Sequence, residues 1–189
     1  VAAIIIETAF IKPKNNYLKN IREICSENDI VLVFDEMWTG FRFSIGGAQE
    51  YFGVNPDLAT FSKGISNGFP ISIITGNGLI MDAFEKIWGF TTFGGDTIPM
   101  VAALTTINEI EENNVIDHIW KYGKELKEAL TILINKYDKN NIFKFVGYDC
   151  RFMFEQTELF NQKKPQIQEL LVKNNILWNN MFVPSFSHR

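Results

Sequence analysis

The stretch IVLVFDE, residues 30–36, is a continuous apolar run that ends on two acidic side chains. Its length and its β-branched residues are typical of a buried strand in a parallel sheet. A similar run, AAIIIE at residues 2–7, precedes it, and apolar side chains between residues 18 and 25 recur at spacings of three and four. We expect a strand covered on both faces, then a helix and a second strand, which is the right-handed crossover unit of an α/β fold.

Two further strands and a long helical region follow along the chain. Residues 58–62 and 71–75 are candidate strands because they are apolar, of strand length and flanked by glycine and proline. Apolar residues at helical spacing predict a long helix from Thr97 to the Asn-Asn pair at 113–114. The same spacing continues to Tyr137, so we expect a second long helix or one kinked helix.

The C-terminal part of the sequence has a different pattern. Residues 143–147 and 151–155 have the length and apolar character of strands, and a helix is expected from Lys164 to Lys173. The sequence therefore predicts three regions, which are part of a large domain at 1–96, long connecting helices at 97–138 and a small, truncated α+β domain at 139–189.

The composition is that of an ordinary globular protein. Of the 189 residues, 46% are hydrophobic, 14% are aromatic and 21% are charged, which excludes disordered, collagen-like and coiled-coil chains. The 18 basic and 22 acidic side chains give a net charge of -4, so we expect neither a nucleic acid nor a membrane as partner. The two cysteines lie far apart in the sequence and indicate no disulfide framework, which favours a reducing cytoplasm. The two histidines lack the spacing of metal ligands, so we expect no metal site built from histidine.

An acid and a lysine follow neighbouring strands of the predicted sheet. Asp35 ends the strand at 30–34, and Lys63 follows the strand at 58–62. Ligands bind at the carboxyl edge of open parallel sheets, so both side chains are candidates for a site there. A lysine that loses its proton in a cleft can add to a carbonyl and form a Schiff base. The alternative is that Asp35 and Lys63 form a structural ion pair.

A third polar cluster, TTFGGD at residues 91–96, stands directly before the helix expected from Thr97. Hydroxyl groups, free backbone N–H groups and the positive end of a helix together make a phosphate cradle. The same residue types are also those that cap helices, so capping is the alternative interpretation of this cluster.

Three segments in order resemble one known family. They are FDEMWTGFR at 34–42, GGAQEYFGVNPDLATFSKGISNGFP at 46–70 and TTFGGDTIPMVAAL at 91–104. Together they resemble the class III, fold-type I pyridoxal-phosphate aminotransferases, and most of all the branch that contains glutamate-1-semialdehyde 2,1-aminomutase. The resemblance implies the C-terminal half of the family's large domain, a mostly parallel sheet with helices, followed by a small α+β domain. It also implies that the family's N-terminal part, with the loop that grips the phosphate, precedes this sequence.

The resemblance implies specific roles for four residues. Lys63 would form the internal aldimine with pyridoxal 5'-phosphate, and Asp35 would pair with the pyridine nitrogen and keep it protonated. Thr92 would hold the phosphate of the neighbouring subunit's cofactor, which implies a homodimer with a shared active site. Trp38 stands where many class III transaminases carry a glutamine, and it would pack beside the cofactor ring. A tryptophan of the hydrophobic core is the alternative for Trp38.

The implied activity is the transfer of an amino group between a small amine and an aldehyde or ketone, by an aminotransferase or an aminomutase in the cytoplasm. The resemblance assigns no role to Glu7, Arg42 or Arg151, although either arginine could clamp a substrate carboxylate.

Two rival functions come from other classes of protein. VLVFDE also has the form of a Walker B strand, in which Asp35 would hold magnesium and Glu36 would prime water in an ATPase. That hypothesis explains neither Lys63 nor the cluster at 91–96, and residues 1–189 contain no P-loop motif. The second rival is a scaffold without activity that keeps the transferase fold, although the presence of both Asp35 and Lys63 argues against it.

Overall fold

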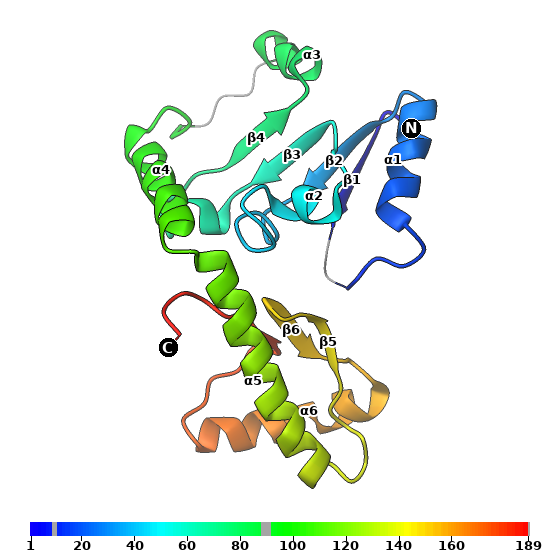
Figure 1. Ribbon diagram of the computed structural model, residues 1–189, viewed down its shortest axis with the longest axis vertical. Helices are drawn as coiled ribbons and strands as arrows, with labels where there is room; N and C mark the ends of the chain where they lie inside the picture. The colour runs from blue at the N-terminus through cyan, green and yellow to red at the C-terminus, as the bar shows by residue number, and fades with distance from the viewer. Residues whose placement is uncertain (9–10, 88–91, 189) are drawn as a thin grey trace. The chain divides into compact units, whose positions relative to one another are not determined.

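The structure is a computed structural model that describes residues 1–8, 11–87 and 92–188 (Figure 1). The chain forms two compact units, Val1–Ile116 and Asp117–Arg189. Among the described residues, no helix is both long enough and apolar enough to cross a membrane.

A four-stranded sheet forms the centre of the first unit. Its strands are β1 (Ala3–Glu7), β2 (Val31–Asp35), β3 (Leu58–Phe61) and β4 (Ile73–Gly76), and they lie in the order β1-β2-β3-β4. The first three strands run parallel, and β4 pairs with β3 in the antiparallel direction. The carboxyl ends of β2 and β3 therefore meet at one edge of the sheet.

Helix α1 (Tyr17–Glu27) covers one face of β1 and β2 (Figure 1). Leu18 and Cys25 of α1 pack with Leu32 and Phe34 of β2, and all four side chains are buried. Leu18 and Cys25 lie two turns apart on the helix face that the predicted spacing indicates, and Leu32 and Phe34 lie on one face of β2, so the crossover unit has the expected form.

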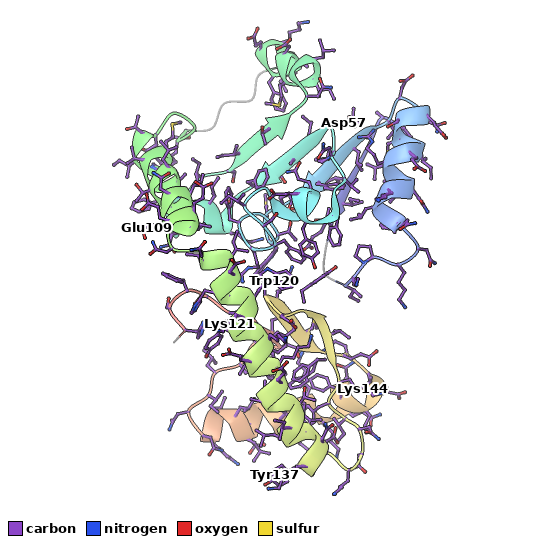
Figure 2. All side chains as sticks on the ribbon, in the orientation of Figure 1. Asp57, Glu109, Trp120, Lys121, Tyr137 and Lys144 are labelled. Atoms are coloured by element: carbon purple, nitrogen blue, oxygen red, sulfur yellow. The ribbon has the colours of Figure 1, made fainter. Side chains whose placement is uncertain are left out.

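An ion pair holds the same crossover together. Nη1 of Arg22 lies 2.8 Å from Oδ2 of Asp57, which is labelled in Figure 2. The same Asp57 oxygen accepts a hydrogen bond of 2.7 Å from the backbone N–H of Leu32. Asp57 thereby links α1, β2 and the loop that leads into β3, which sets the register of the two strands.

The outer face of β1 departs from the expected structure. We expected this strand to be covered on both faces, but Ala3, Ile5 and Glu7 are exposed, and Ile5 retains 64% of its accessible surface. β1 lies at the edge of the sheet, where α1 covers only the face that carries Ile4 and Ile6. The continuous apolar run at residues 2–7 therefore does not mean that the described residues cover both faces of this strand.

Several short elements and one long helix complete the first unit. They are α2 (Gly47–Phe52), the 3-10 helix η1 (Lys63–Ser66), α3 (Gly78–Met81), the 3-10 helix η2 (Asp82–Lys86) and α4 (Thr97–Glu112). Ile65 of η1 and Ala103 of α4 pack with Ala59 and Phe61 of β3 in a second buried cluster. This cluster fixes η1, whose first residue is Lys63, against the end of β3.

The second unit is a small α+β structure. It contains most of α5 (Val115–Tyr137), then β5 (Phe145–Tyr148), β6 (Arg151–Phe154), α6 (Glu158–Lys173) and β7 (Met181–Phe182). The three strands form an antiparallel sheet in the order β5-β6-β7. At Gly123 of α5 an added Cβ would lie 1.9 Å from the carbonyl oxygen of Asp149, so only glycine allows α5 to lie this close to the β5-β6 hairpin.

Helix α6 begins earlier than the sequence predicted. The spacing of apolar residues predicted a helix from Lys164 to Lys173. The helix instead begins at Glu158, after Thr157, whose hydroxyl accepts a hydrogen bond of 3.2 Å from the Phe160 N–H. Pro165 lies inside the helix, where it removes one backbone hydrogen bond without ending the helix.

Candidate active site

Asp35 and Lys63 lie at the same edge of the central sheet. Asp35 is the last residue of β2 and pairs in register with Thr60 of β3, which ends at Phe61, two residues before Lys63. Beyond Asp35, the Glu36 N–H donates to the Thr60 carbonyl oxygen at 2.9 Å, so the two chains stay paired up to this edge. The parallel direction of β2 and β3 thus brings together two residues that are 28 positions apart in the sequence.

Lys63 has an unusual backbone conformation. Its φ angle is 50°, in the left-handed region, where a side chain with a Cβ costs about 1–2 kcal/mol. The neighbouring contacts hold it there, because Ile65 and Ser66 are buried and the Ser62 hydroxyl donates to the Ile71 carbonyl oxygen at 2.8 Å. Of the described non-glycine residues with a positive φ angle, Lys63 and Phe41 alone are neither Asn nor Asp, and strain of this kind occurs more often at functional sites, which makes Lys63 a candidate.

The Lys63 side chain extends over an aromatic ring. Its Nζ atom lies 4.7 Å from the centroid of the half-buried Trp38 ring, within the range of a cation–π interaction. The Asp35 Oδ1 atom accepts a hydrogen bond of 3.0 Å from the Met37 N–H. In the described part of the chain, no ion pair joins Asp35 to Lys63, so the alternative of a structural ion pair is not supported.

The structural role of Glu36 in this region was not predictable from the sequence. Glu36 is only 1% exposed, and its carboxylate accepts hydrogen bonds from the Thr39 hydroxyl and from the backbone N–H groups of Ala48 and Gln49. A buried carboxylate with these partners cannot reach and prime a water molecule, which argues against the Walker B hypothesis. The only sequence signal was the pair Glu36 and Thr39 at a spacing of three, and that is too common to identify a buried contact.

Residues 92–96 of the third cluster lie on a turn before α4. Thr92 is exposed, and the Asp96 N–H donates to the Phe93 carbonyl oxygen at 3.1 Å. Oδ1 of Asp96 accepts from the Ile98 N–H at 3.1 Å, so Asp96 caps the helix as the alternative interpretation expected. Thr91 lies outside the described residues. Capping by Asp96 leaves the Thr92 hydroxyl accessible on the same turn.

A hollow of about 430 Å³ lies between this turn and the segment next to Lys63. Ser62, Ile71 and Phe93 are among the residues that line it. Part of the 92–96 turn and Ser62, the neighbour of Lys63, therefore border one shared space within the first unit, although Lys63, Asp35 and Thr92 do not line it.

The two candidate arginines differ in their surroundings. Arg42 is half-buried in the turn after Trp38, and its backbone N–H donates to the Thr39 carbonyl oxygen at 3.2 Å. Arg151 begins β6 in the second unit and is only 6% exposed. Glu7 is exposed at the end of β1, where it pairs in register with Asp35.

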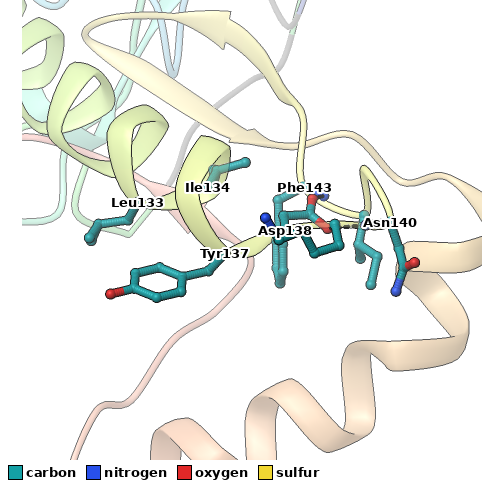
Figure 3. Close-up of a pocket in the computed structure, with 8 residues that line it drawn as sticks. Leu133, Ile134, Tyr137, Asp138, Asn140 and Phe143 are labelled. Carbon is teal, nitrogen blue, oxygen red and sulfur yellow. Dashed lines mark hydrogen bonds between the residues drawn. The ribbon is translucent and has the colours of Figure 1, made fainter.

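A second hollow, of about 460 Å³, lies at the end of α5 in the second unit (Figure 3). None of the predicted site residues lines it. The Asp138 carboxylate there accepts hydrogen bonds from the backbone N–H groups of Phe143 at 2.8 Å and Asn140 at 3.3 Å. Burial on its own would raise the pKa of Asp138, but these bonds and one from Ile142 outweigh it and lower the pKa below its ordinary value. This carboxylate is therefore committed to closing the loop after α5.

A protein-family model matches most of the chain. The family model described as class-III aminotransferase covers residues 1–170. The chain is 42% identical over 138 residues to the glutamate-1-semialdehyde 2,1-aminomutase of Archaeoglobus fulgidus, over 69% of this chain and 33% of that protein. It is 39% identical over 176 residues to the enzyme of that name from Methanocaldococcus jannaschii, over 87% of this chain and 39% of that protein. The chain thus spans less than half the length of these relatives.

Solved structures share the fold. FumI of Sphingopyxis sp. MTA144, in its PLP internal aldimine form, matches 99% of this chain and 47% of its own with a TM-score of 0.87 at 21% identity. An omega-transaminase from Sphaerobacter thermophilus matches 97% of this chain and 47% of its own with a TM-score of 0.83 at 23% identity. These likenesses confirm the predicted fold class, an α/β large-domain half followed by a small α+β domain.

Proposed function

Because the chain belongs to the class-III aminotransferase family, we propose that it carries the lysine of an enzyme that moves an amino group with pyridoxal 5'-phosphate. The substrates are a small amine and an aldehyde or ketone. The observation that carries this proposal is the position of Asp35 and Lys63 at the carboxyl ends of neighbouring parallel strands. A carboxylate and an amine at one sheet edge are the groups that would hold the pyridine nitrogen and the aldehyde carbon of this cofactor.

The side chains at this edge fit the chemistry of the cofactor. Asp35 offers a carboxylate that can keep a proton on the pyridine nitrogen, and Lys63 offers an exposed amine for the aldehyde carbon. Trp38 offers an aromatic surface for the ring, although a purely packing role is the alternative. When bound, the cofactor supplies a ring that accepts the electron pair released when a substrate C–H bond breaks.

The residues of this chain supply binding, orientation and proton transfer. The Met37 N–H fixes one oxygen of Asp35, so the negative charge of that carboxylate has a defined direction. Lys63 Nζ would hold the cofactor covalently and, as a free amine, would carry a proton to or from the reacting carbon. Its left-handed backbone and the buried side chains of η1 limit where Nζ can reach.

An intramolecular shift of the amino group is the form of the reaction that we favour. The relatives at 39–42% identity are named glutamate-1-semialdehyde 2,1-aminomutase. Trp38 stands in place of the glutamine of many transaminases, which separates this chain from that branch. Turnover of an amino aldehyde without an added amine donor would support the shift, and strict dependence on a donor would support transamination.

We place the site between two copies of the chain. Thr92 is exposed on its turn and would hold the phosphate of the cofactor in the neighbouring subunit. The helix that follows has an exposed apolar face, with Ile98, Val101 and Leu104 each more than 60% accessible. Such a face is typical of a surface that another protein covers, which supports a homodimer. The free, buried thiol of Cys25 supports a location in the cytoplasm.

The experiment that tests the function compares two lysine variants of the intact protein. Lys63→Ala should lose turnover of an amino aldehyde and the absorption band of the bound cofactor while keeping its thermal stability. Lys19→Ala is the matched control, because Lys19 is an exposed lysine of α1, a helix that packs on β1 and β2 and carries none of the proposed site residues. Normal turnover in Lys63→Ala contradicts the proposal. A folded parent protein with neither cofactor nor turnover supports the scaffold alternative.

A further inference from the structure

The loop between β2 and α2 is closed around the Glu36 carboxylate. Burying a charged carboxylate is costly unless hydrogen bonds replace its water. Glu36 has such bonds from the Thr39 hydroxyl, from the Ala48 N–H at 2.9 Å and from the Gln49 N–H at 2.9 Å. Hydrogen bonds to an ionised group are about twice as strong as neutral ones, so this one side chain ties together both ends of the segment 36–49.

The surrounding backbone is built to admit this carboxylate. Gly47 has a φ angle of 82°, and an added Cβ would lie 2.7 Å from the carboxyl carbon of Glu36. At Gly40, an added Cβ would lie 2.8 Å from the Glu36 carbonyl oxygen and 2.5 Å from the Phe61 ring. Both glycines are therefore required by close approach, one to the side chain and one to the backbone of Glu36.

The same loop carries the Trp38 side chain and the backbone N–H that fixes Asp35. Trp38 lies between Glu36 and Thr39, whose side chains are bonded to each other, and the Gly40 N–H donates to the Glu36 carbonyl oxygen at 2.8 Å. The Met37 N–H, which fixes the Asp35 carboxylate, belongs to the same closed turn. A displacement of the Glu36 carboxylate would therefore also displace the Asp35 carboxylate and the Trp38 ring, over which Lys63 lies.

We propose that Glu36 is a positioning residue, which holds the turn at 36–40 so that Asp35 and Trp38 meet the cofactor and Lys63 in fixed directions. This role rests on the proposed function, because it concerns the same site. Glu36 contacts neither the cofactor nor the substrate. It acts through the Met37 N–H on one side and through the Trp38 ring on the other.

The test uses three variants of the intact protein. Glu36→Gln keeps the size of the side chain but turns an NH2 group toward backbone N–H donors that need an acceptor. Thr39→Val removes one hydroxyl donor and Thr39→Ser restores it, so this pair separates the hydrogen bond from packing. Glu50→Gln is the matched control, because Glu50 is an exposed carboxylate that accepts from the Gly46 N–H at 2.8 Å in the same region.

Two readouts are measured on each variant. The first is the pH dependence of the absorption of the bound cofactor together with kcat and KM. The second, on cofactor-free protein, is the rate at which an acylating reagent modifies Lys63 at fixed pH, found by mass spectrometry. We expect Glu36→Gln and Thr39→Val to shift the absorption profile and to lower kcat by up to about 100-fold, as a displacement of about 1 Å can do. Both variants should also change the acylation rate of Lys63 in cofactor-free protein. Thr39→Ser and Glu50→Gln should resemble the parent in both readouts.

Separate outcomes overturn the inference and the proposed function. A folded Glu36→Gln protein with the parent's absorption profile, kcat and Lys63 rate overturns the positioning role. If that variant fails to fold, equal values in Thr39→Val and Thr39→Ser overturn it. If the parent protein binds no cofactor at Lys63, the proposed function fails. The Lys63 modification rates then still decide whether Glu36 controls the turn.

Discussion

The Nζ atom of Lys63 lies 4.7 Å from the centre of the Trp38 ring, although 25 positions separate the two residues in the sequence. Trp38 follows β2 and Lys63 follows β3, so the parallel pairing of the two strands brings them together. The cation–π attraction gives the lysine amine a defined resting position at the edge of the sheet.

Replacing Trp38 should release the Lys63 side chain. A cation–π contact at an exposed site is worth about 0.5–1 kcal/mol, so Trp38→Leu should raise the rate of Lys63 acylation in cofactor-free protein by about 2- to 5-fold at fixed pH. Trp38→Phe keeps an aromatic face and should stay closer to the parent. Equal rates in all three proteins would show that the ring does not restrain the amine.

Replacing Asp35 by asparagine should separate binding from chemistry. The asparagine oxygen can still accept from the Met37 N–H, but the negative charge that keeps the pyridine nitrogen protonated is lost. We expect the cofactor to remain bound, with proton abstraction slowed on the order of 100-fold or more. Single-turnover kinetics with substrate measure this step, and an unchanged rate would refute the assigned role of Asp35.

The sequence was sufficient for the part of the site that local patterns determine. The run from Ile30 to Phe34 and the helical spacing between residues 18 and 25 predicted the crossover unit. The position of Asp35 at the end of one strand and of Lys63 after the next then predicted a shared sheet edge. These inferences held because the ends of adjacent parallel strands must lie on the same side of a sheet.

Features that depend on distant contacts were not predictable in the same way. The antiparallel direction of β4 is not encoded in its own apolar run, because strand direction depends on the path of the connecting loop. The burial of Glu36 depends on its meeting the N–H groups of Ala48 and Gln49, which are 12 and 13 positions away. The early start of α6 follows from the Thr157 cap, which the apolar spacing of residues 164–173 does not reveal.

Thr92→Ala should weaken binding of the cofactor phosphate. A hydrogen bond to a charged group contributes about 1.5–3 kcal/mol, which corresponds to about a 10- to 100-fold loss of affinity. Thr92→Ser keeps the hydroxyl and should bind nearly as well as the parent. Titration of cofactor-free protein with pyridoxal phosphate measures the difference, and equal affinity in the alanine variant would contradict the role of Thr92.

A pair of glycine variants should isolate the close approach to Glu36. Gly47 and Gly53 both have positive φ angles, of 82° and 63°, but an added Cβ meets the Glu36 carboxyl group only at Gly47. Gly53→Ala should cost about 1–2 kcal/mol of unfolding free energy from backbone strain alone. Gly47→Ala should cost more than this. Urea unfolding compares the two, and equal losses would mean that the carboxylate can move aside.

Replacing Asp138 by asparagine should change the response of the second unit to acid. The lowered pKa of Asp138 means that its carboxylate stabilises the folded state at pH values above its ordinary pKa of 3.8. That contribution is lost as the pH falls through the lower pKa of the folded state. We expect Asp138→Asn to expose the amides of Asn140 and Phe143 to faster hydrogen exchange at pH 7, with a smaller difference near pH 3. An equal difference from the parent at both pH values would contradict this linkage.

The central claim is that Lys63 binds the cofactor covalently, and one measurement tests it most directly. The intact protein is loaded with pyridoxal phosphate, reduced with borohydride and digested, and the modified peptide is mapped by mass spectrometry. The account predicts a pyridoxyl group on Lys63 and none in the Lys63→Ala variant. A folded, loaded protein with the label on another lysine, or with no label at all, would contradict it.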